Sequence, residues 1–97
     1  MISKEDIIAM CGLTEEEVAA IAEHEHMPDV AAAAFAKYVL EQEHDPARLK
    51  EMIVDDFRVA VRARRFEHAQ EIILALRHFL AEFPQARSDR GQAGPQT

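Results

Sequence analysis

The sequence predicts an all-α fold: a compact bundle of four main helices preceded by a short N-terminal helix. Of its 97 residues, 48% are hydrophobic, which is enough for a modest core. Only three Gly and four Pro occur, and two Gly and one Pro lie in the last seven residues, so the body of the chain is nearly free of helix breakers. We expect a single helical domain over residues 1–84, followed by a disordered polar tail over residues 85–97.

The first two helices are indicated by their capping residues. Ser3 is a suitable N-cap for a short helix that ends at Gly12, a residue type that favours the left-handed position after a helix. Thr14 and Glu17 have the spacing of a capping box, which opens the second helix. This helix should end just before Pro28, because the residue preceding a proline avoids the α region.

The remaining helices follow from prolines and apolar periodicity. A proline suits the first turn of a third helix, over about residues 28–44. Asp45–Pro46 repeats this signature and opens a fourth helix, over about residues 46–64. The apolar face drifts around Arg64–Phe66, so we expect a break there and a fifth helix over about residues 67–83.

Charge and cysteine content narrow the class of protein. The net charge of −7 is uneven, −9 over residues 1–45 and +2 over residues 46–97, so the two halves could attract each other within one chain or between two copies. The single Cys11 excludes an intrachain disulfide framework, and no signal peptide or apolar run of about 20 residues is visible. We expect a soluble cytoplasmic protein without a membrane partner.

No nucleic-acid partner is expected. The segment over residues 10–22 has the helix, glycine turn and helix outline of a DNA-binding motif. Glu15, Glu16 and Glu17 occupy the start of its second helix, where they would repel phosphates.

Two histidines alternate with carboxylates in Glu23-His24-Glu25-His26, and residues of these types bind metals and move protons. Glu23 and His26 are three apart, as are Glu41 and His44, the spacing with which four-helix di-iron proteins present ligands. Both pairs lie at predicted helix ends, where histidines also serve as C-terminal caps. A helical wheel turns Glu23 towards solvent. It turns Glu25 towards the apolar side, where Arg64 or another arginine of residues 46–97 would be a suitable partner.

Asp56 is anomalous because it lies in the middle of the apolar face of the fourth helix. A buried carboxylate must be hydrogen-bonded, paired or protonated. Its structural role would be to pair with an arginine, a histidine or Tyr38, or to cap the start of a neighbouring helix. Its functional role would be to form one wall of a polar pocket with His24 or His26, and contact with a second copy is a further alternative.

The fifth helix carries a second stripe opposite its apolar face. Such a stripe is usually a solvated surface, but Leu74 within it indicates contact with a partner, and an isologous homodimer is its simplest use. The residues of this predicted interaction surface are Glu67, Glu71, Leu74 and His78.

With "GLTEEEVAAIAEHEHMPDVAAAAFAKYVL" and "LRHFL" in its sequence, the chain resembles a small family of uncharacterised bacterial helical proteins. The resemblance covers most of residues 12–83. It implies an all-helical fold, and no functional residue is carried over from it.

Three hypotheses about function remain open. The first is a non-enzymatic cytoplasmic interaction or accessory module without a cofactor, since the sequence has no Gly-rich phosphate loop, no Cys pair, no HExxH and no G-x-S-x-G. The second is a metal-binding or proton-handling site, for which the candidate residues are Glu23, His24, Glu25, His26 and Asp56. The third is a pH-sensitive interface formed by protonated histidines against the acidic first half.

Overall fold

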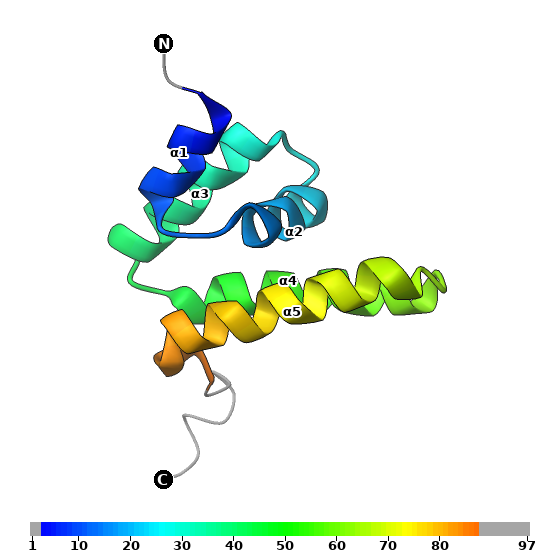
Figure 1. Cartoon of the computed structure of the whole chain (residues 1–97). Coiled ribbons are helices and arrows are strands. Elements are labelled where there is room, and N and C mark those ends of the chain that lie inside the picture. The colour runs from blue at the N-terminus through cyan, green and yellow to red at the C-terminus, as the bar shows by residue number, and fades with distance from the viewer. Residues whose placement is uncertain (1–2, 88–97) are drawn as a thin grey trace, which may run out of the picture.

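The computed structural model describes residues 3–87, and this part of the chain is all-helical, with no strand (Figure 1). The all-α class predicted from the sequence is confirmed. The helices are α1 (Lys4–Cys11), α2 (Glu15–Glu25), α3 (Asp29–Glu41), α4 (Pro46–Arg62) and α5 (Phe66–Glu82), followed by the short 3-10 helix η1 (Pro84–Arg87).

The predicted capping signals form as expected. Ser3 and Asp6 make a capping box at the start of α1, and Gly12 ends that helix with a φ of 84°. At the start of α2, the Thr14 N–H donates to Glu17 Oε1 at 2.9 Å, while the Glu17 N–H donates to Thr14 Oγ1 at 3.2 Å. These bonds satisfy backbone groups that the first turn of a helix otherwise leaves unpaired.

The predicted break between the fourth and fifth helices is also confirmed. Helix α4 ends at Arg62 and α5 begins at Phe66, so the two form an antiparallel hairpin (Figure 1). Arg64 adopts a φ of 61°, and the Arg65 N–H donates to the Ala60 carbonyl at 2.9 Å. These features end the helix in the left-handed manner that glycine usually provides.

Helices α1, α2 and α3 lie on one side of the α4–α5 hairpin, and α1 and α3 run obliquely to it (Figure 1). The predicted bundle of four main helices is therefore not confirmed in detail. Helix α2 packs against α3 and against both helices of the hairpin. Side chains from the hairpin-facing side of α2 are consequently brought against α4 and α5.

The core lies between these two groups of helices. Its largest fully buried apolar side chains are Ile21 of α2, Leu49 and Ile53 of α4, and Phe79 of α5. Among the residues with described burial, only two buried side chains are charged in type, Glu17 and Asp56. A buried carboxylate needs a partner, so these two residues mark where the fold departs from simple apolar packing.

The short helix η1 extends past residue 84, the predicted end of the domain. Ala86 in η1 is fully buried, and η1 packs against α4 and α5. The rest of the predicted tail, residues 88–97, lies outside the described residues. None of the described helices combines the length and apolar character needed to cross a membrane.

Candidate functional site

Asp56 lies at the centre of the candidate site because its carboxylate faces the interior. It shares the buried face of α4 with Met52, Ile53 and Ala60, and only 5% of its surface is exposed. Its Oδ2 atom is buried and has no hydrogen-bond partner. An unsatisfied buried carboxylate oxygen is costly, so this atom calls for a proton or a cation.

Glu23 of α2 and His68 of α5 meet beside Asp56. Glu23 Oε1 lies 2.7 Å from His68 Nε2, and Glu23 Oε2 lies 3.6 Å from Arg65 Nη1. The other ring nitrogen of His68, Nδ1, lies 3.3 Å from Glu71 Oε1. One oxygen each of Glu23 and Asp56 and one nitrogen of His68 all lie within 4.8 Å of one another. Three helices therefore each supply one potential metal ligand.

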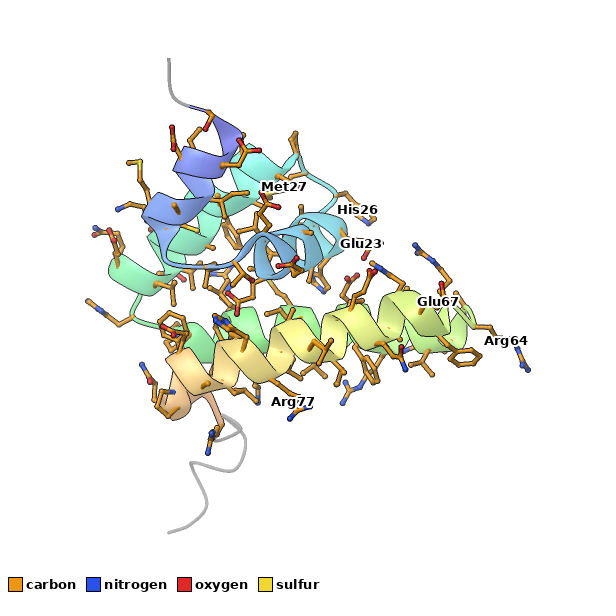
Figure 2. The ribbon with its side chains drawn as sticks, viewed as in Figure 1. Glu23, His26, Met27, Arg64, Glu67 and Arg77 are labelled. Carbon is orange, nitrogen blue, oxygen red and sulfur yellow. The ribbon has the colours of Figure 1, made fainter. Side chains whose placement is uncertain are left out.

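These groups open onto a pocket of about 430 Å³ between the C-terminal end of α2 and the hairpin. Figure 2 shows Glu23 and His26 at this end of α2, above the hairpin. The lining residues are Glu23, His24, His26, Asp55, Asp56, Val59, Ala60, Arg65 and His68. The site is therefore reachable by a small ligand, while its innermost carboxylate is shielded from water.

The two carboxyl groups of the cluster differ in acidity. Burial, and then the hydrogen bond and negative charge of Glu23, raise the pKa of Asp56 to about 7. The hydrogen bond with Asp56, assisted by His68, lowers the pKa of Glu23. Two ionised carboxylates cannot hydrogen-bond to each other, so this bond forms when Asp56 carries a proton, and in the ionised form Asp56 Oδ2 has no partner. The hydrogen bond to Glu23 also raises the pKa of His68.

His24 lies in the same pocket but is already engaged at both ring nitrogens. Its Nδ1 is 2.8 Å from Glu25 Oε2 and its Nε2 is 3.1 Å from Asp55 Oδ2. Burial opposes the charged ring, but these two hydrogen bonds outweigh it and raise the pKa of His24. His24 therefore ties α2 to α4 and has no free nitrogen for a ligand.

The structure bears on two predictions about the Glu23–His26 segment. Glu23 is exposed, as predicted, but its carboxylate also contacts His68, because α5 lies beside the flank of α2 that a single-helix wheel leaves open. Glu25 was predicted to turn inward towards Arg64, but it is partly exposed and pairs with its neighbour His24. His26 caps α2 with a φ of 58° and is exposed on the pocket wall.

The second predicted Glu-x-x-His pair does not join the site. Glu41 pairs with Lys37 one turn earlier on α3, at 2.9 Å. His44 lies beyond the end of α3 with a φ of 52° and is exposed. Neither residue lines the pocket between α2 and the hairpin.

Sequence reasoning missed His68 and the burial of Glu17. His68 lies four residues before Ile72 and so flanks the apolar stripe of α5, which was the available signal. Glu17 was interpreted only as a capping residue, but it is fully buried, and its Oε2 lies 2.7 Å from His78 Nδ1. Nothing in the sequence reveals that pairing, which joins residues 61 positions apart.

The predicted interaction surface on α5 is partly engaged within the chain. Glu71 contacts His68, and His78 contacts Glu17. Leu74 is 59% exposed, and Glu67 is exposed as well.

Comparison with protein-family models, curated proteins and solved structures finds no match to this chain. The resemblance to a bacterial helical family stays a prediction, and function must be argued from the site itself.

Proposed function

We propose that this protein binds one divalent first-row transition-metal ion through Glu23, Asp56 and His68. The observation that carries the proposal is the buried Asp56 Oδ2, which has no hydrogen-bond partner and lies beside two further potential ligands. Presenting ligands from facing helices towards a shared interior is how helical proteins build metal sites.

The donor set favours Zn²⁺, Fe²⁺ or Mn²⁺ over harder cations. Two carboxylates and one imidazole suit first-row transition metals, whereas Ca²⁺ requires six to eight oxygen ligands. Three protein ligands would leave a coordination position open towards the pocket of about 430 Å³. An open position is the arrangement of metal sites that bind a further small ligand.

A cation would also replace the shared proton of Glu23 and Asp56. With both groups ionised, two negative charges would lie close together, one of them on the buried Asp56, and a metal ion removes that repulsion. Ligand atoms within 4.8 Å of one another need only small side-chain rotations to come within the roughly 2.0–2.2 Å of a metal that such ligands adopt.

Cys11 would not compete as a ligand. It is buried, and its Sγ lies 3.0 Å from the Ile8 carbonyl oxygen. Burial raises the pKa of its thiol, which disfavours the thiolate that binds metals.

We further propose a cytoplasmic location, which the single cysteine of the chain supports.

Titration of tag-free, metal-stripped protein with Co²⁺ tests the proposal, because its visible absorption reports coordination. We expect one ion per chain and bands of four- or five-coordinate Co²⁺. Asp56→Asn and His68→Gln should each weaken binding by more than the roughly 10–100-fold that loss of an outer-shell partner costs.

His44→Gln is the matched control for His68→Gln, since His44 is exposed and does not line the pocket. Its affinity should equal that of the wild type. Binding that survives Asp56→Asn unchanged would place the ion elsewhere. No binding at all would leave the cluster as a proton-sharing pair and contradict the metal function.

A further inference from the structure

We propose that the chain forms an isologous homodimer through the exposed face of α5, with Phe66 of each copy seated beside Leu74 of the other. This inference goes beyond the metal site and does not depend on it. It rests on two exposed apolar side chains and an apolar groove. Arginines lie beside one of these side chains, Phe66, and glutamates lie at the edges of the groove.

Phe66 and Leu74 are the large apolar side chains that α5 leaves in solvent. Their exposed fractions are 57% and 59%. Gln70, also exposed, lies midway between them. Residues at intervals of four form one ridge on a helix, so Phe66, Gln70 and Leu74 lie along a continuous line that no other described element covers.

Leu74 borders a groove of about 340 Å³ between α5 and the start of α2. Its lining residues are Thr14, Glu16, Glu71, Leu74, Ala75 and His78. Ala75 is buried and forms an apolar floor, while Glu16 and Glu71 are exposed at the edges. The groove therefore suits an apolar side chain whose neighbouring residues are positively charged.

The chain itself provides such a side chain. Phe66 directly follows Arg64 and Arg65 at the tip of the hairpin, and Arg62 precedes them. All four residues are exposed. Arg62 and Arg64 at the tip of one copy thus complement Glu16 and Glu71 at the groove of another, while Arg65 also contacts Glu23 within its own chain.

The spacing permits a closed, two-fold arrangement. Phe66 and Leu74 each lie four residues from Gln70, about 6 Å along the helix axis. Two antiparallel α5 helices related by an axis at Gln70 therefore place each Phe66 beside the partner copy's Leu74. The two Gln70 amides then meet at the axis, where each can donate to and accept from the other. Such an interface is self-complementary and closes at two copies.

Sedimentation at increasing protein concentration tests the dimer directly. We expect a species of twice the chain mass that Phe66→Glu and Leu74→Glu each convert to monomer. Both substitutions replace exposed side chains, so the helical circular dichroism should not change. Val30→Glu is the matched control, because Val30 is 43% exposed on α3, away from this face, and this variant should remain dimeric.

Gln70→Cys tests the symmetry axis. Under mild oxidation we expect a covalent dimer to form in high yield, whereas Gln42→Cys, also exposed but beyond the end of α3, should form none. Wild-type protein that stays monomeric at all concentrations would overturn the proposal. It would be overturned equally if α5 bound only a different protein, or if a dimer persisted in both Phe66→Glu and Leu74→Glu.

Discussion

The two buried carboxylates Glu17 and Asp56 differ in whether their oxygens have hydrogen-bond partners. Glu17 is fully buried, and both of its oxygens are used, one by the Thr14 N–H and one by His78. Asp56 is nearly as buried but keeps an oxygen without a partner. A buried carboxylate whose oxygens are both hydrogen-bonded, such as Glu17, is accounted for by its role in the fold. An unsatisfied one lowers stability and so indicates a role in binding.

Asp56→Asn should stabilise the metal-free protein at alkaline pH. The pKa of Asp56 is raised to about 7 by burial and by Glu23, so between its unfolded value near 3.8 and pH 7 the folded state holds the extra proton. Stability therefore falls as the pH rises through this window. Asparagine has no charge to bury, and we expect a gain of about 1–2 kcal/mol at pH 8.

Urea unfolding in the presence of a chelator measures this gain. The difference between the two proteins should shrink as the pH falls towards 3, below the unfolded value, where Asp56 is protonated in the folded state and mostly protonated in the unfolded state. Equal destabilisation by Asp56→Asn at both pH values would instead indicate a lost structural hydrogen bond.

The His78–Glu17 pair should make the folded state more stable at low pH than at high pH. The hydrogen bond to Glu17 raises the pKa of His78, and the charges of Glu17, Glu82 and Glu16 add to this effect. The charged pair contributes fully to the free energy of unfolding below the unfolded-state pKa of His78, near 6.5. This contribution disappears as the pH rises through the raised folded-state pKa. His78→Gln should therefore cost more stability at pH 5.5 than at pH 9, in chemical unfolding monitored by circular dichroism. A constant cost would show that His78 contributes only as a neutral hydrogen-bond donor.

At the scale of the elements, the helices could be predicted because their signals are local. Ser3, Thr14 and Asp45 cap helices through bonds within a few residues, and the break near Arg64 follows from the drift of one apolar stripe. The site could be predicted only in part. Asp56 is detectable on a wheel because it interrupts its own apolar face. Glu23 and His68 lie at the flanks of their helices, and only the packing of α2 on α5 brings them together.

Thr14→Ala should destabilise the fold by about 1 kcal/mol, the usual effect of losing a threonine N-cap. Helix α2 packs against α3, α4 and α5, so fraying at its start is transmitted to the whole molecule. Ser3→Ala is the matched comparison, because it removes the same kind of cap from α1, which packs mainly on α3. We expect its cost to be smaller, about 0.5 kcal/mol. Equal midpoints of thermal unfolding for the two variants would contradict the central place of α2.

At the scale of the whole molecule, histidine–carboxylate contacts join α2 to the hairpin. They are His24 with Asp55, His68 with Glu23, and His78 with Glu17. The uneven charge of the sequence is thus used partly within the chain, since in two of the three pairs the carboxylate, Glu23 or Glu17, comes from the acidic half. Ile21 of α2, Leu49 of α4 and Phe79 of α5 are fully buried in one core cluster, which provides the apolar part of the same contact. A ligand that binds Glu23, Asp56 and His68 together would add a further link across it.

Metal binding should therefore protect a particular part of the molecule from hydrogen exchange. A ligand that binds only the folded state at 100 times its Kd stabilises it by about 2.7 kcal/mol. Since the ligands come from α2, α4 and α5, exchange should slow in the C-terminal half of α2 and in the adjoining turns of the hairpin. It should change least in α1, which makes few contacts with these helices. Mass spectrometry of exchanged peptides with and without Zn²⁺ measures the pattern, and Asp56→Asn should abolish it. Protection centred on the exposed His44 would show adventitious binding at a surface histidine and would contradict a site that links the three helices.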